Sequence, residues 1–158
     1  MSEPSLKSYI REQIEQGRKM VAADIAATPE DLLLTSPGGA ARAAVDYVYE
    51  LSYVHRRFAK RLRGEDPGQF PQGFLVAPDE YRSKEKAIEE FGESTDDMLS
   101  AWNAVPDDRI AETIVLPAGQ TTPLELMSIA ITHMAYHDGQ LNQLQALNGD
   151  TEIHWDFE

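Results

Sequence analysis

Two histidines, His133 and His137, lie four positions apart in the stretch Thr132–Gln140 near the end of the chain. Residues four apart share one face of an α-helix, so this spacing directs both imidazole rings toward one point. Paired imidazoles at this spacing are typical metal ligands. A third histidine, His55, falls on the apolar stripe of another expected helix. Three inward histidines in a helical bundle suggest a bound divalent cation.

Each histidine also has a structural explanation, as a buried neutral ring satisfied by ordinary hydrogen bonds. Three imidazoles taken out of water are costly unless all their nitrogens find partners, and one shared metal ion supplies a partner to every ring. Zinc and similar ions accept neutral imidazole, and three protein ligands with an open fourth position are typical of catalytic zinc sites. We therefore favour a metal site. The fourth histidine, His154, lies beside Trp155 in the tail, where it either completes the metal shell or packs.

The residues around the histidine pair exclude two common metalloenzyme motifs. Zinc proteases need glutamate directly after the first histidine, and this chain has Met134 there. Di-iron bundle proteins need Glu-x-x-His on two helices, and the sequence contains no such pair. Gln140 continues the row one turn beyond His137. There it either hydrogen-bonds a ligand of the metal or serves as a polar residue at the mouth of the bundle.

Four amphipathic segments predict the helices that position these side chains. They span about residues 5–27, 44–62, 79–104 and 123–147, and the second carries His55 in mid-stripe. Thr122 provides an N-cap for the last helix, with proline at its first position and Glu125 three residues after the cap. Asn148-Gly149 is a helix stop signal. Residues 64–78 contain three prolines and three glycines and form a long connection, and residues 113–116 are expected to be an extended loop.

Four helices of this length, with one long connection between the second and the third, predict an all-α four-helix bundle. The 158 residues fit one domain, which we place at 1–158. The apolar stripes of the helices must face inward, so the histidines are expected in the interior.

The composition restricts the partners. Twenty-seven acidic residues against 14 basic ones give a net charge of −13, which repels phosphate backbones and anionic membranes. We therefore expect no nucleic acid and no membrane as partner. The sequence has no apolar run of about 18 residues, which predicts a soluble, cytoplasmic protein. One basic cluster stands out, and it either attracts an anionic substrate or forms a solvated helix face. It comprises Arg56, Arg57, Lys60, Arg61 and Arg63.

The chain resembles a known family in four features taken together. These are a histidine on the second helix, His-x-x-x-His on the last, Gly139-Gln140 just after that pair, and the Pro-x-Glu start of the last helix. They resemble the DinB-like (DinB/YfiT-like) metalloenzyme superfamily of four-helix-bundle proteins, over essentially the whole chain. The resemblance implies metal ligands at His55, His133 and His137. It also implies a divalent ion such as nickel or zinc, and a homodimer.

Characterised relatives in that superfamily are transferases and isomerases that use bacillithiol, mycothiol or glutathione. Such chemistry suits a chain without cysteine, because an open metal position binds an incoming thiol and lowers its pKa. We therefore expect a thiol-dependent transferase that acts on small electrophiles, with a low-molecular-weight thiol as cosubstrate. Two alternatives stay open. One is a non-enzymatic metal-binding or stress-related protein, and the other is a metal-assisted hydrolase, for which the sequence offers no convincing general base.

Overall fold

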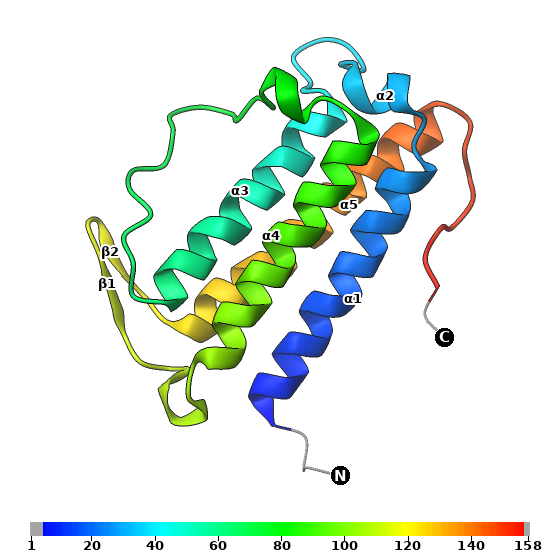
Figure 1. Ribbon diagram of the computed structural model, residues 1–158. Helices are drawn as coiled ribbons and strands as arrows, with labels where there is room; N and C mark the ends of the chain where they lie inside the picture. Colours follow the sequence, from blue (N-terminus) through cyan, green and yellow to red (C-terminus); the bar gives the residue numbers. More distant parts are fainter. Residues whose placement is uncertain (1–4, 157–158) are drawn as a thin grey trace.

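The computed structural model describes residues 5–156 and shows four long helices packed side by side (Figure 1). Shorter elements lie in the connections between them. The long helices are α1 (Leu6–Ala27), α3 (Ala44–Leu62), α4 (Lys84–Ala104) and α5 (Pro123–Leu147). The short elements are α2 (Glu30–Leu34), single 3-10 turns at Asp79–Tyr81 and Asp107–Arg109, and the strands β1 (Ile114–Leu116) and β2 (Gly119–Thr121). The all-α four-helix class is confirmed, as is the long connection between the second and third long helices.

The helix ends follow the capping residues of the sequence. Thr122 caps α5 by accepting a hydrogen bond from the Glu125 N–H, and proline occupies the first turn, as predicted. Gly149 follows the helix with φ of 87°, a conformation that glycine adopts without strain. The third long helix begins later than expected, at Lys84, because the Ser83 side chain accepts from the Lys86 N–H and caps the helix there.

Residues 113–116 differ from the expected solitary loop. Ile114–Leu116 pair antiparallel with Gly119–Thr121, with Ile114 opposite Thr121. The sequence indicated extended character in the first strand but gave no sign of the second, which is only three residues long and starts at a glycine with φ of 147°. This hairpin lies at the end of the bundle where α5 begins (Figure 1).

The core fills the space between the long helices. Helix α3 packs against α4 and α5, and α1 packs against the same two helices. The largest fully buried apolar side chains come from all four long helices and from α2. They are Trp102, Phe91, Ile14, Ile25, Leu33, Leu51, Met98, Met127, Met134 and Leu141. Helix α5 is thereby fixed on both sides, which positions the two histidines that it carries.

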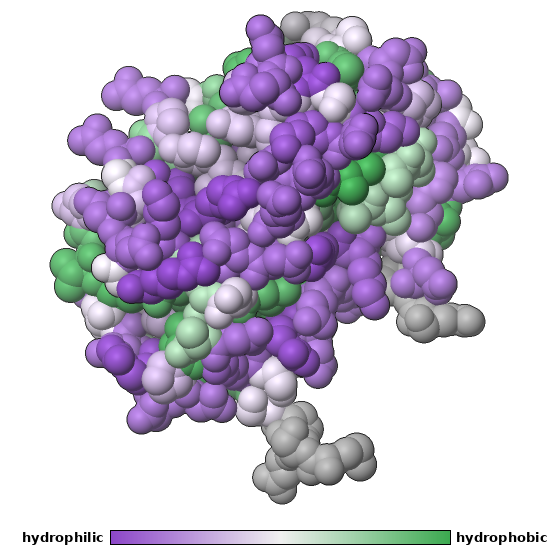
Figure 2. All heavy atoms as spheres, viewed as in Figure 1, coloured by the Kyte–Doolittle hydropathy of each residue, from purple (hydrophilic) through white to green (hydrophobic). Residues whose placement is uncertain are grey.

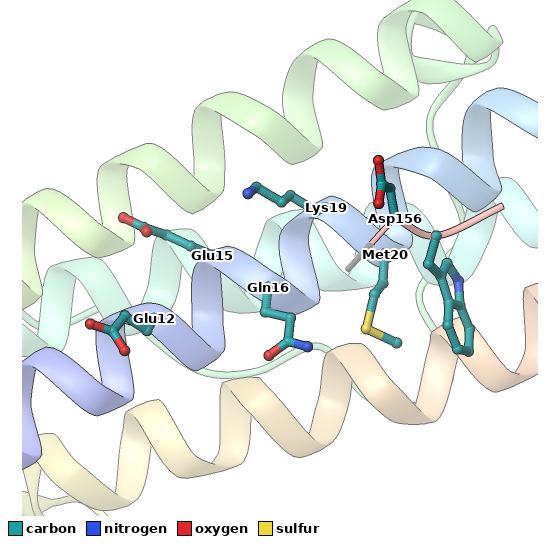
Figure 3. Close-up of a pocket in the computed structure, with 7 residues that line it drawn as sticks. Glu12, Glu15, Gln16, Lys19, Met20 and Asp156 are labelled. Carbon is teal, nitrogen blue, oxygen red and sulfur yellow. The ribbon is translucent and has the colours of Figure 1, made fainter. Parts of the chain in front are cut away.

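The C-terminal tail returns along α1. A hollow of about 340 Å³ lies between α1 and this tail, and Figure 3 shows Asp156 of the tail beside Lys19 and above Met20. The Trp155 indole N–H donates to the carboxylate of Asp24 on α1. This hydrogen bond attaches the tail to α1.

The surface is mostly polar on the face shown in Figure 2, in keeping with the charge of the chain. One group of apolar side chains lies at the left edge of this view, where Figure 1 places the hairpin. Phe70 and Phe74 of the long connection and Val115 of the hairpin are exposed. None of the helices within residues 5–156 combines the length and apolar composition that crossing a bilayer requires.

Candidate metal centre

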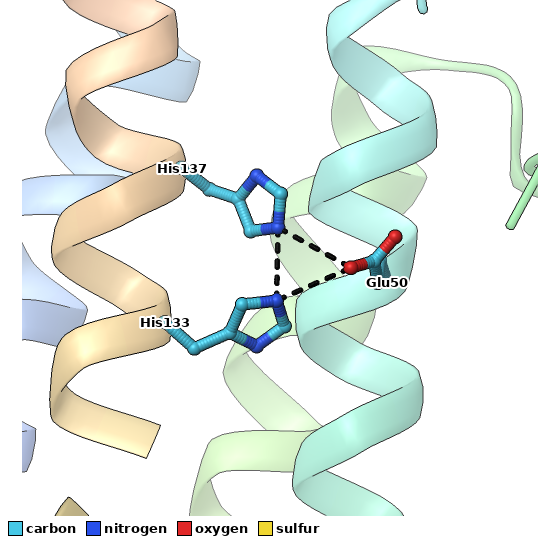
Figure 4. A group of neighbouring side chains, drawn as sticks. All are labelled: Glu50, His133 and His137. Carbon is cyan, nitrogen blue, oxygen red and sulfur yellow. Dashed lines mark hydrogen bonds and ion pairs between the residues drawn. The ribbon is translucent and has the colours of Figure 1, made fainter. Parts of the chain in front are cut away.

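Three side chains from two helices converge between α3 and α5. Figure 4 shows His133 and His137 projecting from α5 toward Glu50 on α3. The Nε2 atoms of the two histidines lie 2.9 Å apart. Glu50 Oε1 lies 3.3 Å from Nε2 of His133 and 3.5 Å from Nε2 of His137. Within residues 5–156, this is the one group of at least three such ligand atoms that lie within 4.8 Å of one another.

The triangle of ligand atoms has the dimensions that one transition-metal ion requires. A circle through the three atoms has a radius of about 1.9 Å, which is shorter than a metal–nitrogen bond of about 2.0–2.1 Å. A single ion would therefore find all three atoms within bonding distance. Two imidazoles and one carboxylate form a donor set that zinc and non-haem iron both use, with further positions left open for other ligands.

The protonation states of these groups also suit a metal. Burial lowers the pKa of His137 to about 4, although its hydrogen bond with Gln140 acts in the opposite direction. Burial likewise lowers the pKa of His133, against the effect of Glu50. Burial alone would raise the pKa of Glu50, but hydrogen bonding and charge from Arg42, with contributions from the two histidines, lower it. Near pH 7 the site therefore presents neutral imidazoles and an ionised carboxylate.

Neighbouring side chains fix the orientation of the ligands. Gln140 Oε1 lies 2.6 Å from His137 Nδ1, so it accepts the Nδ1–H and leaves the Nε2 lone pair directed at the site. The ring of Tyr47 stacks parallel to His137, with centroids 5.3 Å apart. The guanidinium of Arg42 lies 2.5 Å from Glu50 Oε2, which leaves Oε1 facing the histidines. Gln140 thus contacts the site through His137.

His55 lies deeper in the bundle and outside the ligand group. Its side chain is fully buried, and its Nδ1 lies 3.1 Å from the Thr95 hydroxyl on α4. That hydroxyl donates to the Phe91 carbonyl at 2.7 Å, so it accepts the Nδ1–H of His55. The Nε2 atom of His55 has no hydrogen-bond partner among the described residues. Metal coordination by His55 stays a prediction, whereas His133 and His137 converge as their spacing predicted.

His154 is also outside the group. Its Nε2 lies 2.9 Å from the Asp150 carboxylate in the tail. The structure therefore gives this histidine a local acidic partner.

Sequence reasoning did not identify Glu50. Five positions separate it from His55, and at 100° per residue the two side chains point about 140° apart around the helix. Glu50 consequently faces α5, whereas His55 faces α4. The available signal was a single carboxylate within the otherwise uncharged run Tyr47–Val54 of an apolar helix. A buried charge in such a run indicates a partner, which here comes from a distant part of the chain.

Comparisons with known proteins agree with this architecture. The model of the DinB superfamily matches residues 12–141. The crystal structure of a DinB-like protein, YjoA, from Bacillus subtilis is similar in fold, with a TM-score of 0.73 and 15% sequence identity. The match covers 93% of this chain and 96% of that chain. No curated protein matches the sequence significantly. The chain belongs to the DinB superfamily.

Proposed function

We propose that the protein binds one divalent cation through Glu50, His133 and His137 and is a thiol-dependent transferase acting on small electrophiles. The observation that carries the proposal is the convergence of these three ligand atoms beside an apolar hollow of about 640 Å³. Nickel or zinc is the expected ion. When bound, the ion would act as a Lewis acid that lowers the pKa of a thiol from a cosubstrate.

The chain's own residues orient the ligands and supply an apolar surface beside them. Gln140 holds His137 and Arg42 holds Glu50, so two of the three ligands are oriented before any ion arrives. Val54, Phe58 and Ile129 line the adjoining hollow and give it an apolar wall against which a substrate would lie. In the transfer itself, the sulfur forms a bond to an electrophilic carbon while the bond to the leaving group breaks. The thiol proton goes to solvent.

Two features favour thiol transfer over hydrolysis. The sequence has no cysteine, so any thiol must come from outside, and the hollow beside the ligands has room for one. Hydrolysis by a metal-bound hydroxide needs a general base. Among the described residues that line this hollow, Glu50 is the only carboxylate, and the proposal already uses it as a ligand.

The first test measures metal content. Protein purified without an affinity tag is stripped, loaded with nickel or zinc, and analysed by inductively coupled plasma mass spectrometry. We expect about one ion per chain in the wild type and a loss of the ion in Glu50→Gln and His137→Ala. The matched control is Glu90→Gln, because Glu90 pairs with Arg56 away from the site. Equal metal content in all four proteins would contradict the site.

The second test measures thiol chemistry. Cobalt-loaded protein is mixed with glutathione, bacillithiol or mycothiol, and the absorption spectrum is followed for a sulfur-to-cobalt charge-transfer band. The same mixtures receive monobromobimane, whose bromide leaves when the thioether forms. We expect a rate above background that disappears in His137→Ala and persists in Glu90→Gln. A loaded protein that shows no charge-transfer band with any thiol would instead support the non-enzymatic metal-binding alternative.

A further inference from the structure

A groove leads away from the candidate metal ligands between α3 and α5. The hollow of about 640 Å³ that contains Glu50 and His133 adjoins a second hollow of about 320 Å³. The two hollows share four lining side chains and therefore adjoin, and we name them together the α3–α5 groove. The shared residues are Val54, Phe58, Phe70 and Ile129. The groove is therefore apolar along its middle.

The two ends of the groove carry different chemistry. Glu50, Val54, Phe58 and Arg61 succeed one another at steps of four, four and three on α3. These steps place them on one face of the helix, and eleven residues at a rise of 1.5 Å span about 16 Å. Arg61 and Arg57 line the end that lies away from the metal ligands. One wall thus runs from a metal ligand, past apolar side chains, to a guanidinium.

Arg61 lacks the carboxylate ion-pair partner that most other arginines of the chain have. In residues 5–156, every arginine except Arg57 and Arg61 lies within ion-pair distance of a carboxylate. Arg57 donates instead to the backbone carbonyls of residues 67, 68 and 69 in the long connection. In the described part of the chain, the Arg61 side chain forms no hydrogen bond or ion pair, and the one opposing charge that acts on it comes from Asp66. The Asp66 carboxylate accepts a hydrogen bond from the Gly68 N–H, and its charge raises the pKa of Arg61 without forming an ion pair with it.

An unpaired guanidinium is notable in a protein with a net charge of −13, where carboxylates are abundant. Arg61 is half-buried, and burial together with the charge of Arg57 lowers its pKa, against the opposing effect of Asp66. An anion placed at this end of the groove would neutralise two neighbouring positive charges. The apolar walls are also open to a ligand, since Phe70 is 46% and Ile129 is 51% exposed.

We propose that the α3–α5 groove binds an amphipathic carboxylate, with the carboxylate at Arg61, the apolar chain along Val54, Phe58 and Ile129, and the far end beside Glu50 and His133. The assignment of this ligand class as the electrophilic substrate rests on the proposed function, because the far end meets the metal ligands. Recognition of the carboxylate by Arg61 involves only the groove, and it is tested without metal.

The experiment uses dodecanoate, whose extended chain approaches the length of the groove. Metal-free protein is titrated with dodecanoate below its micelle concentration by isothermal titration calorimetry. We expect one binding site, and a loss of affinity of about 10-fold or more in Arg61→Gln because a charge-assisted hydrogen bond is removed. Arg61→Lys should retain most of the affinity. The matched control is Arg11→Gln, which removes an exposed arginine of α1 that pairs with Glu15. Circular dichroism establishes that each variant is folded.

The orientation of the ligand gives a second readout. In protein loaded with manganese, the terminal methyl protons of dodecanoate should broaden more than the protons next to the carboxylate. Equal affinities of Arg61→Gln and Arg11→Gln for dodecanoate would overturn the proposal. It would also be overturned if dodecyltrimethylammonium bound as tightly as dodecanoate, or if the protons next to the carboxylate broadened more than the methyl protons. Absence of dodecanoate binding, together with a dimer that Ile129→Asp dissociates, would instead assign the groove to a second copy of the chain.

The outcomes separate this inference from the proposed function. Metal uptake without dodecanoate binding would reject the groove ligand and leave the metal site standing. Dodecanoate binding that depends on Arg61, in a protein that takes up no metal, would support the recognition of the carboxylate and reject the metal-dependent transferase.

Discussion

The Nε2 atoms of His133 and His137 lie 2.9 Å apart, with ring planes inclined by 61°. His137 donates its Nδ1–H to Gln140, so its Nε2 carries a lone pair. Without an ion, the His133 Nε2–H is then the donor between the two rings. Nδ1 of His133 has no hydrogen-bond partner within residues 5–156. The two histidines are therefore not equivalent, because a neighbouring amide fixes the proton position of only one ring.

Replacing Gln140 by alanine should weaken metal binding without removing a ligand. The His137 Nδ1–H loses its acceptor, so the ring is no longer held with Nε2 toward the site. Loss of such an orienting hydrogen bond typically costs about 10- to 100-fold in metal affinity. The measurement is competition against a chromophoric chelator. Gln143→Ala is the matched control, since Gln143 lies on the same helix and lines a hollow that also contains Gln140. Equal affinities for the two variants would contradict the role of Gln140.

The local features of the sequence predicted much of the fold. The helices followed from apolar spacing and capping residues, and the convergence of His133 and His137 followed from one turn of a single helix. Their third partner was not predictable in this way. Which side of α3 faces α5 depends on how the helices pack, and the apolar stripe of α3 is broad enough to cover both Glu50 and His55. The pairing of Ile114–Leu116 with Gly119–Thr121 was missed because three-residue strands carry little pattern.

Asp24 should be important for the stability of the fold. It is 1% exposed, and its carboxylate accepts hydrogen bonds from the side chains of Asn142, Gln145 and Trp155. Asp24→Ala leaves these donors without their acceptor, at a cost of about 1–3 kcal/mol for each buried donor that finds no water. Burial and then the charge of Asp24 raise the pKa of Asp138 to about 7. Removing Asp24 also removes its repulsion of the Asp138 carboxylate, which offsets part of this loss.

We therefore expect Asp24→Ala to lower the free energy of unfolding by about 2 kcal/mol or more, measured by urea denaturation at pH 7. Asp96→Ala is the control. It removes a carboxylate with an exposed side chain that pairs with Arg18, and it should cost less than about 1 kcal/mol. Similar losses in the two variants would show that the Asp24 cluster contributes no more than a surface ion pair.

The homodimer implied by the family resemblance is a further prediction. Exposed apolar side chains such as Tyr9, Phe74 and Tyr136 offer surface that association would bury. Light scattering at tens of micromolar should then give about twice the chain mass of 17.7 kDa. A mass near that of one chain across a dilution series would reject the dimer.

His55 should make the stability of the protein depend on pH. Burial, followed by the charge of His133, lowers its pKa to about 3, whereas histidine in an unfolded chain titrates near 6.5. Between these values the unfolded chain binds a proton that the folded protein does not. The contribution of His55 to the free energy of unfolding therefore has its largest value above pH 6.5 and decreases as the pH falls toward 3. The slope is on the order of 1 kcal/mol per pH unit.

The measurement is urea denaturation at several values between pH 4 and pH 7, with His55→Leu compared with the wild type. Other titrating groups act in both proteins, so the difference between the two curves isolates His55. We expect the stability advantage of the wild type to shrink, or to reverse, as the pH falls. Thr95→Val is the control, because it removes the hydroxyl that His55 contacts but leaves the imidazole buried. It should lower stability while keeping the wild-type slope. If the curves of His55→Leu and the wild type run parallel, protonation of His55 does not oppose folding.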